Sequence, residues 1–455
     1  MNIVKLYQRF PFSVKNFIAG INGLKLNYWR KKNRKKIVAE LIRRESWTSG
    51  QYKEWQNKVL REMLMHARTS VPYYRHYWDN NSGINFLELE NWPVLEKQTV
   101  RNSPELFIAE THKNKKLFKI NTSGTTGKPM TFLFDRDALS LWYAMYQRRL
   151  REWNGVNEDD RCATIAGQLI CPIEQKKAPF WVYNKPMHQI YLSSYHITED
   201  TVKHYINAIA DFETEYMMGY VSSIYNIAKE GLRQNLKMPK LKLVVTNAEP
   251  LLEHQKEVIA KAFSCPVLQS YSGCEFAFGG CEDLSGRIYL WPEAGIMEVQ
   301  DEKGNINKYG KGEFIITGLV SKVMPLVRYR VGDTGEVRPA DNRGRNVDYV
   351  SEVTGRTDDL VVTADGKLVG RLDPVFKGDF RIKEAQIIQD DITNIRVLVV
   401  PDKGYSKYEE NEILQRLRDR VGSSMQLRVE LTDRIPRGAN GKFKAVISLV
   451  KKQSS

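Results

Sequence analysis

The segment from Asn121 to Pro129 concentrates chemical groups that suit phosphate binding. It reads Asn-Thr-Ser-Gly-Thr-Thr-Gly-Lys-Pro, so two glycines, four hydroxyl side chains and a lysine fall within nine residues. It lies between two short apolar runs, 117–120 and 130–134, whose branched and aromatic residues favour strands. A polar loop of this kind can direct N–H groups, hydroxyls and a cation at phosphate oxygens. The alternative is an ordinary Thr- and Gly-rich surface turn.

This loop differs from the nucleotide-binding loop that opens a helix. That pattern places four residues between its glycines and a Ser or Thr after the lysine. Here two residues separate Gly124 from Gly127, and Pro129 follows Lys128. Because proline disfavours a helical conformation at the preceding residue, we expect the chain to continue as a strand.

The composition indicates a globular protein with more than one domain. The chain has 455 residues, of which 42% are hydrophobic and 27% charged, and this length exceeds a single ordinary core. No apolar run approaches the roughly 20 residues needed to span a bilayer. Lys5, Arg9 and Lys15 interrupt the apolar start of the chain, which therefore lacks a secretory pattern. Five scattered cysteines favour reduced thiols and a cytoplasmic location.

The net charge of +15 is concentrated near the start of the chain. The basic cluster consists of Lys25, Arg30, Lys31, Lys32, Arg34, Lys35 and Lys36. We expect a solvated helix face; an anionic membrane, nucleic acid or a polyphosphate substrate are the alternatives. The apolar residues that precede it are Phe10, Phe12, Phe17, Ile18, Ile21 and Leu24. Apolar residues followed by cations are compatible with an interfacial helix, so peripheral contact with the inner face of the membrane is a hypothesis.

The middle of the chain predicts a strand, a helix and a second strand. The expected elements are a strand at 241–246, an amphipathic helix at 253–263 and a strand at 266–271. A parallel pair places both strand ends at one edge, where open α/β sheets bind ligands. Polar turns at 247–250 and 272–275 follow the two strands and therefore predict a shared cleft. Residues 37–70 are expected to be helical.

Several segments resemble, in order, the motifs of the adenylate-forming superfamily. These segments are Ser123–Lys128, Asn247–Glu249, Tyr271–Glu275, Tyr329–Asp333, Gly355–Asp359 and Arg437–Lys442. The resemblance covers nearly the whole chain. It is greatest to the phenylacetate–CoA ligase-like branch and to members named for capsular polysaccharide biosynthesis.

The resemblance assigns nucleotide-binding roles to individual residues. Ser123, Gly124, Thr125, Thr126, Gly127 and Lys128 would grip the β- and γ-phosphates of ATP. Asn247, Ala248, Glu249, Tyr271, Ser272 and Gly273 would surround the adenine, with the Tyr271 ring stacked on it. Arg330 and Asp333 belong to the motif that binds the ribose. Ser272 stands where the family has glycine, which leaves the local backbone geometry open.

The catalytic assignments also follow from the resemblance. Glu275 would help to hold magnesium, Arg356 would face the phosphates, and Lys442 would catalyse adenylation, with Lys444 as a rival assignment. Asp358 would be the hinge between two domains. Tyr195, His196, Gly219 and Tyr220 match segments that line the acyl pocket, although His196 is equally compatible with a structural histidine.

The resemblance therefore implies an α/β protein with two domains. Residues 1–357 would form a large multi-layer adenylation domain of sheets flanked by helices, and residues 358–455 a small mobile α+β domain. The implied activity is an ATP- and magnesium-dependent ligase that forms an acyl-adenylate and releases pyrophosphate. The acceptor would be coenzyme A, a carrier protein or a sugar amine, in cell-surface polysaccharide biosynthesis.

One other function remains as an alternative. A catalytically retired fold could bind a nucleotide or scaffold a membrane assembly, although such a protein would not need Lys442, Asp333 or Glu275. Nucleic-acid binding is not expected, because no nucleic-acid module is recognised in the chain. Structural zinc is not expected either, since Cys274 and Cys281 are seven residues apart without a nearby histidine.

Overall fold

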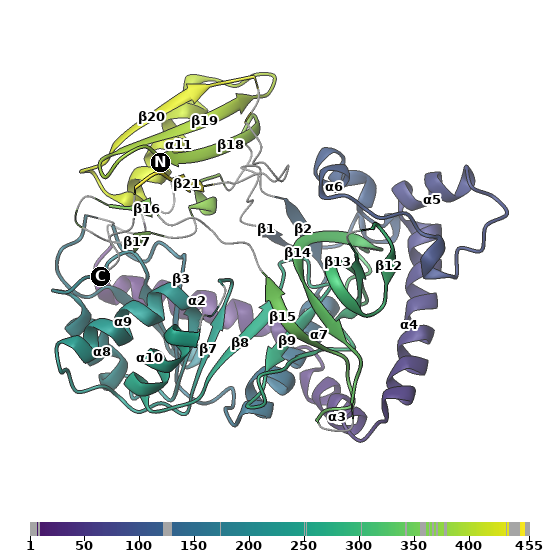
Figure 1. Cartoon of the computed structure of the whole chain (residues 1–455), viewed down its shortest axis with the longest axis horizontal. Helices are drawn as coiled ribbons and strands as arrows, with labels where there is room; N and C mark the ends of the chain where they lie inside the picture. Colours follow the sequence, from purple (N-terminus) through teal and green to yellow (C-terminus); the bar gives the residue numbers. More distant parts are fainter. Residues whose placement is uncertain are drawn as a thin grey trace.

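The computed structural model describes most of the chain. The described residues are 7, 10–121, 130–172, 174–249, 251, 253–301, 303–341, 344–354, 361–363, 365, 368–369, 372–376, 380–433, 435 and 446–450. They form a large mixed α/β body and a smaller α+β unit beside it (Figure 1). The fold class expected from the sequence is thereby confirmed.

The helices and helical turns are as follows. They are α2 (Phe12–Arg30), α3 (Arg34–Arg44), α4 (Ser49–Ser70), α5 (Pro72–Asp79), η1 (Leu89–Asn91), α6 (Lys97–Asn102), η2 (Pro104–Phe107), η3 (Glu110–His112), α7 (Arg136–Met145), η4 (Tyr146–Arg151), η5 (Glu152–Asn154), η6 (Lys185–Met187), α8 (Val202–Asp211), α9 (Val221–Arg233), α10 (Glu253–Phe263), η7 (Asp373–Phe376) and α11 (Lys407–Val421). None of these helices is long and apolar enough to cross a lipid bilayer.

The strands of the large body belong to two sheets. A hairpin pairs β1 (Phe118–Asn121) with β2 (Thr131–Phe134). The other strands are β3 (Cys162–Ala166), β4 (Trp181–Asn184), β5 (Gln189–Ser193), β6 (Tyr216–Tyr220), β7 (Leu243–Asn247), β8 (Val267–Ser272), β9 (Gly279–Glu282), β10 (Ile288–Leu290), β11 (Gly295–Gln300), β12 (Ile306–Asn307), β13 (Gly310–Gly318), β14 (Tyr329–Arg338) and β15 (Tyr349–Thr354). These 13 strands form one sheet in the order β12-β11-β13-β14-β15-β10-β9-β8-β7-β6-β3-β5-β4.

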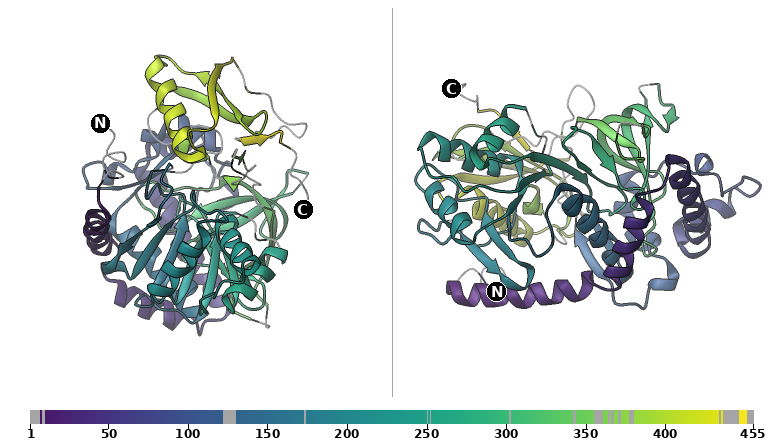
Figure 2. Two further views of the ribbon diagram at one scale, coloured as in Figure 1. Left: turned by 90° about the vertical axis from the view of Figure 1, so that its left-hand side faces the viewer. Right: turned by 90° about the horizontal axis from the view of Figure 1, so that it is seen from below.

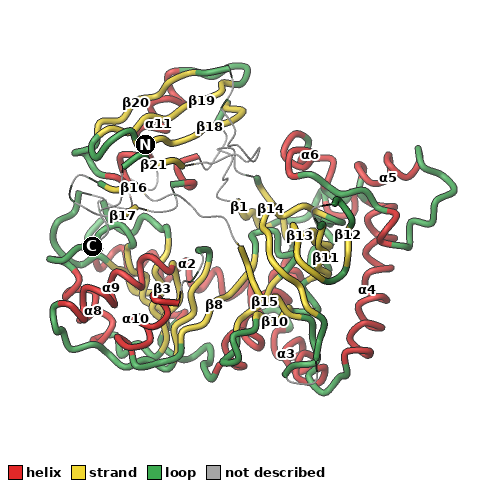
Figure 3. Tube along the Cα trace, in the orientation of Figure 1, coloured by secondary structure: helices red, strands yellow, loops and turns green. Residues whose placement is uncertain are grey.

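The centre of this sheet is parallel. Strands β5, β3, β6, β7 and β8 run in one direction, whereas β4 and the strands from β9 onward join antiparallel. Parallel strands need crossover connections, and here α8, α9 and α10 provide them. The apolar sides of these three helices pack on one face of the sheet (Figure 3). The carboxyl ends of the parallel strands therefore lie along a single edge.

Helix α2 lies on the other side of the sheet, at the outside of the molecule (Figure 2). Its inner side is fixed by Asn16, whose Oδ1 accepts from the backbone N–H of Tyr183 at 2.9 Å, and by Asn27, which donates to the carbonyl of Pro186 at 3.0 Å. Gly23 allows this close approach, because a Cβ there would lie 2.1 Å from Asn184 Oδ1. One side of α2 thus packs against the rest of the protein.

The helical prediction for 37–70 is correct except at one interruption. Helix α3 ends at Arg44, and α4 begins at Ser49. Thr48 caps the second helix: its hydroxyl accepts from the N–H of Gln51 at 3.2 Å, and Gln51 Oε1 accepts from the N–H of Thr48 at 2.8 Å. This capping box satisfies donors that a continuous helix would have paired internally.

The predicted central unit is confirmed in detail. The structure has α10 at the predicted 253–263, and β7 and β8 within two residues of the predicted strands. The two strands pair in parallel, with Asn247 opposite Ser270. The polar turns after them therefore lie together, as the sequence predicts.

The strands from residue 361 onward form sheets separate from the large one. They are β16 (Val361–Val362), β17 (Leu368–Val369), β18 (Ile382–Gln389), β19 (Asn394–Pro401), β20 (Gln426–Leu431) and β21 (Val446–Ser448). A four-stranded sheet with the order β20-β19-β18-β21 shares a core with α11. That core also includes Tyr195, which follows β5, so the small unit packs near the carboxyl edge of the large sheet. The expected boundary at 357/358 and its hinge fall outside the described residues.

A buried ion pair ties the end of η4 to the segment after β10. Arg149 Nη2 lies 2.6 Å from Glu293 Oε1, and both side chains are almost fully buried. Arg44 is a second, more distant cation, with Nη1 at 3.4 Å from the same oxygen. Removing one partner of such a pair leaves an uncompensated charge in the interior.

We predict that Arg149→Met lowers the free energy of unfolding by about 3 kcal/mol, because Glu293 loses its nearest cation. Urea denaturation measures the change. The double variant Arg149→Met/Glu293→Leu should recover most of this loss, because it removes both charges. Arg75→Met, in an exposed pair with Glu110, is the matched control and should unfold like the parent. Equal stability of the single and double variants would contradict the prediction.

Candidate nucleotide and acid site

The carboxyl edge of the sheet carries the residues expected beside the adenine. Asn247 is the last residue of β7 and pairs with Tyr220 of β6 and Ser270 of β8. Ala248 follows with a φ of 67°, a left-handed conformation that is uncommon outside glycine and marks a sharp turn. The chain therefore leaves the strand abruptly and brings residues 248 and 249 over the sheet edge.

The carboxylate of Glu249 anchors this turn to the beginning of α9. Its Oε2 accepts from the backbone N–H of Ser222 at 2.7 Å, and its Oε1 accepts from the Ser222 hydroxyl at 3.1 Å. The first N–H groups of a helix lack partners within the helix and favour negative charge. Glu249 thus holds the turn in place, whether or not it also contacts a ligand.

Tyr271 and Asp333 lie 62 residues apart in the sequence, yet they meet at the site. The hydroxyl of Tyr271 donates to Asp333 Oδ2 at 3.0 Å. The Tyr271 ring is also held by Phe278 and Phe314, with ring centroids 4.9 and 5.8 Å away. The residues expected at the adenine and at the ribose are therefore neighbours.

In the segment from Ser272 to Glu275, glycine is required at position 273 and not at position 272. Ser272 ends β8 as a regular strand residue opposite Gly279, so the departure from the family pattern does not disturb the strand. A Cβ at Gly273, in contrast, would lie 2.2 Å from Glu275 Oε2. Glu275 is buried, and none of the described residues donates a hydrogen bond to its carboxylate. Such a carboxylate fits a hard cation such as magnesium.

Arg330 has carboxylate partners within the protein. Its Nε lies 2.8 Å from Glu96, and a second nitrogen pairs with Glu313. The arginine of the predicted ribose motif thus links β14 to β13 and to the start of α6. Its neighbour Asp333 faces Tyr271 instead.

The four residues expected in the acyl pocket lie around the carboxyl ends of β3, β5 and β6. Both ring nitrogens of His196 are engaged, Nδ1 with the Ser193 hydroxyl at 2.8 Å and Nε2 with the Pro172 carbonyl at 2.9 Å. Tyr195 is buried and donates to the carbonyl of Gly167 at 3.0 Å.

Gly219 and Tyr220 complete this group. A Cβ at Gly219 would lie 2.0 Å from the carbonyl oxygen of Ile165, so glycine is required where β6 approaches β3. The Tyr220 hydroxyl lies near Gly167, close enough that a Cβ there would be 3.0 Å away. These residues shape the sheet edge, and His196 has the contacts of a structural histidine.

The remaining predicted residues fall outside the described part of the chain: Ser123, Gly124, Thr125, Thr126, Gly127, Lys128, Arg356, Asp358 and Lys442. The hairpin that carries the predicted phosphate loop is nevertheless present. Asn121 and Thr131 face each other at its end, and the Thr131 hydroxyl donates to Asn121 Oδ1 at 2.8 Å.

A cavity of about 380 Å³ adjoins the nucleotide residues. It extends along the face of the parallel strands that is opposite α8, α9 and α10. Its lining includes Asn247, Ala166 and Gln168 at the carboxyl edge, and Glu158, His188 and Gln189 toward the amino edge. It is also lined by Arg30, Lys31, Arg34, Trp142, Tyr143, Tyr146, Arg151, Asp159, Thr164, Tyr191 and Met218.

The sequence reasoning missed most of this lining. It placed Arg30 and Arg34 on a solvated helix face, but both line the cavity. Tyr143 in α7 and Tyr146 in η4 are at helical spacing, which could have indicated a shared cavity wall. The same spacing is equally typical of helix residues that pack in a core. Burial raises the pKa of the Tyr191 phenol, and the Arg30 guanidinium opposes that shift.

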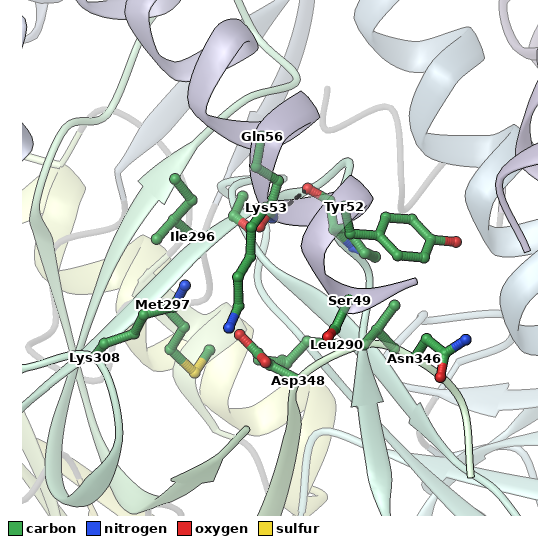
Figure 4. Close-up of a pocket in the computed structure, with 13 residues that line it drawn as sticks. Ser49, Tyr52, Lys53, Gln56, Leu290, Ile296, Met297, Lys308, Asn346 and Asp348 are labelled. Atoms are coloured by element: carbon green, nitrogen blue, oxygen red, sulfur yellow. Dashed lines mark hydrogen bonds between the residues drawn. The ribbon is translucent and has the colours of Figure 1, made fainter. Parts of the chain in front are cut away.

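A second cavity lies between the start of α4 and strands β10 and β11 (Figure 4). Its volume is about 30 Å³, which is room for about one water molecule. Lys53 points toward Asp348 (Figure 4), which accepts hydrogen bonds from Tyr309 and from the N–H of Ala340. This cavity is too small for a nucleotide or an acyl group.

Four of the five cysteines, all but Cys274, are buried. No group of three metal-ligating side chains exists among the described residues. Cys162, Cys171, Cys265, Cys274 and Cys281 are all unbridged. Burial raises the pKa of Cys171 to about 11 and that of Cys265 to about 12, so these thiols stay protonated at neutral pH.

Comparisons with known proteins agree with these features. The family model for the CapK C-terminal domain matches residues 361–449. Protein CapK of Staphylococcus aureus is 28% identical over 98% of this chain and 99% of its own length. Phenylacetate-coenzyme A ligase of Pseudomonas putida is 24% identical over 68% of this chain and 72% of its own length.

The fold also matches a solved structure. 2-Hydroxyisobutyryl-CoA ligase in complex with 2-HIB-AMP and CoA superposes with a TM-score of 0.58 and 18% identity, covering 90% of this chain and 92% of the other. The chain is thus similar to CapK over nearly its whole length and to phenylacetate-coenzyme A ligases over about two thirds of it, and it shares the fold of 2-hydroxyisobutyryl-CoA ligase.

Proposed function

We propose that the protein is an ATP-dependent ligase that activates a carboxylic acid as an acyl-adenylate and then transfers the acyl group. The observation that carries this proposal is the shared boundary of two sites. Asn247 belongs to the adenine-side turn and also lines the 380 Å³ cavity. ATP at the sheet edge and an acid in the cavity would therefore meet at the end of β7.

The described residues supply the nucleotide half of this site. The Tyr271 ring offers an apolar face for the adenine, and Asp333 offers carboxylate oxygens to the ribose hydroxyls. Glu275 would hold Mg²⁺, which supplies charge neutralisation at the phosphates when bound. The glycine-rich loop after β1 would bind the β- and γ-phosphates through its N–H groups and hydroxyls.

The reaction joins an oxygen of the acid to the α-phosphorus of ATP. The bond from that phosphorus to the bridging oxygen breaks, and pyrophosphate leaves. Because two anions must approach each other, positioning and electrostatic stabilisation dominate such a step. Lys442 would contact both the carboxylate and the α-phosphate, and Arg356 would face the phosphates. Both assignments rest on the motif resemblance.

In the second half-reaction an acceptor attacks the acyl carbon and AMP leaves. The relatives named phenylacetate-coenzyme A ligase support coenzyme A as the first acceptor to test. A carrier protein and a sugar amine are the alternatives, and the resemblance to members named for capsular polysaccharide biosynthesis supports the sugar. Rotation of residues 358–455 about Asp358 would exchange Lys442 for the segment that assists transfer.

We predict carboxylic acid-dependent exchange of labelled pyrophosphate into ATP, measured with magnesium and pooled acids. Lys442→Ala should lower this exchange by about 100- to 1,000-fold, since one preorganised cation is lost. The same variant should still transfer the acyl group from a supplied acyl-adenylate. Lys444→Ala is the matched control and should retain exchange. Nucleotide binding by the parent without exchange for any acid would favour the retired-scaffold alternative.

A second prediction tests Glu275 through its neighbour. Gly273→Ala places a methyl group where the Glu275 carboxylate lies, so the carboxylate must move. We expect magnesium-dependent exchange to fall roughly 100-fold, because small displacements of a positioning group are that costly. Gly50→Ala, whose Cβ would approach no atom closer than 3.7 Å, is the control. An unchanged rate, with the fold intact by circular dichroism, would remove Glu275 from the mechanism.

We also propose that α2 contacts an anionic membrane surface. The residues exposed along it are Val14, Phe17, Ile21, Leu24 and Tyr28, spaced three and four apart on one helical stripe. Phe17 is 69% and Leu24 61% exposed. The neighbouring lysines Lys25, Lys35 and Lys36 are exposed as well. An apolar stripe beside cations suits an interfacial helix on anionic lipid.

We predict that the protein floats with vesicles of phosphatidylcholine and phosphatidylglycerol, and much less with phosphatidylcholine alone. Phe17→Ser/Leu24→Ser should weaken the partition constant by about 100-fold, because two large apolar side chains no longer enter the lipid. Leu284→Ser, at an exposed leucine in the turn after β9, is the control. If the parent instead forms a dimer without lipid and the double variant is monomeric, the stripe is an interface with a second copy of the chain.

A further inference from the structure

We propose that the acid activated by this protein carries a second anionic group, which is recognised on the cavity wall by Arg30 and Arg151. This inference rests on the proposed function, because it assigns the chemistry of the acid at the same site. A tail with a carboxylate or another anion would lie along the sheet, with its reacting carboxylate at the end of β7.

The cavity has a direction that the strands define. Asn247, Ala166 and Gln168 line its end at the carboxyl edge, where the nucleotide residues lie. His188 and Gln189, at the start of β5, line the opposite end. Five strand residues span about 13 Å. An acid can therefore react at one end and be recognised at the other.

Arg151 lies at the distal end, and no carboxylate of the described residues forms an ion pair with it. Its guanidinium lies between the rings of Tyr146 and Tyr216, 5.7 and 5.8 Å from their centroids, and Tyr216 begins β6. Nη1 donates to Gln147 at 3.2 Å. Within the described part of the chain, its buried Nε has no hydrogen-bond partner. A buried donor without a partner is costly unless a ligand completes it.

Arg30 approaches the same cavity from α2. Its guanidinium stacks on the ring of Tyr143, 3.8 Å from the centroid, which fixes its position without consuming its hydrogen bonds. No carboxylate among the described residues pairs with it. The two arginines therefore come from elements far apart in the sequence and leave donors free on the same cavity wall.

The other charged groups on the wall do not cancel this pair. Glu158 is already engaged by Arg34 and by Lys31, whose Nζ lies 3.7 Å away. Asp159 is the second carboxylate. Four cations thus face two carboxylates, which leaves the cavity positive. A neutral fatty tail would need an apolar lining, whereas this wall favours an anion.

The test compares α,ω-dicarboxylates from glutarate to sebacate with monocarboxylates of the same carbon number. Pyrophosphate exchange gives KM and kcat, and calorimetry gives direct binding. We expect at least one diacid to exceed its matched monoacid. Arg30→Gln and Arg151→Gln should each raise the KM for that diacid by about 10- to 100-fold, with little change in kcat or in the monoacid KM. Arg75→Gln, outside the cavity, is the control.

The outcomes separate this inference from the proposed function. If monoacids support exchange at least as well as diacids, and substitution of Arg30 or Arg151 does not change the exchange, the inference is overturned. The proposed adenylation activity is then unaffected. Calorimetric binding of a diacid that depends on either arginine, without exchange, supports the recognition of the anion and overturns adenylation. If the protein shows neither diacid binding nor exchange, both the inference and the proposed function are overturned. Because Arg151 packs between two rings, Arg30→Gln keeps the test decisive if the Arg151 variant does not fold.

Discussion

The parallel register of β3, β6, β7 and β8 is the constraint on which the rest of the structure depends. It brings the ends of four strands to one edge and so gathers side chains that lie far apart in the sequence. Gly219 shows how tight this register is, since its Cα approaches the carbonyl oxygen of Ile165 too closely for any side chain. Because the strands cannot shift, the turns at 247–249 and 272–275 keep a fixed separation.

Two kinds of interaction convert this edge into a site. Local ones fix individual turns, as when the Glu249 carboxylate holds the beginning of α9. The long-range hydrogen bond from Tyr271 to Asp333 joins the parallel strands to the antiparallel half of the sheet. A ligand that occupies the edge would therefore contact both halves. Tyr195 belongs to the core of the small unit, which therefore lies beside the same edge.

The sequence was sufficient wherever one short segment determines its own structure. The helix at 253–263 and the strands around it follow from periodicity, and their polar ends follow from the rule for parallel sheets. The break at 45–48 was missed because a capping box interrupts a hydrophobic pattern that continues on both sides of it. The surroundings of His196 also could not be predicted, since its partners Ser193 and Pro172 become neighbours through the path of the folded chain.

The basic cluster marks the limit of sequence reasoning most clearly. A run of cations is usually a solvated face, and Lys25, Lys35 and Lys36 are indeed exposed. Arg30, the last residue of α2, and Arg34, the first residue of α3, belong to the same run but line the cavity. One helix thus offers an apolar stripe to the outside and a guanidinium to the inside. The Arg30 side chain is held by Tyr143, more than a hundred residues later in the sequence. No local pattern could therefore distinguish the arginine that lines the cavity from the lysines at the surface.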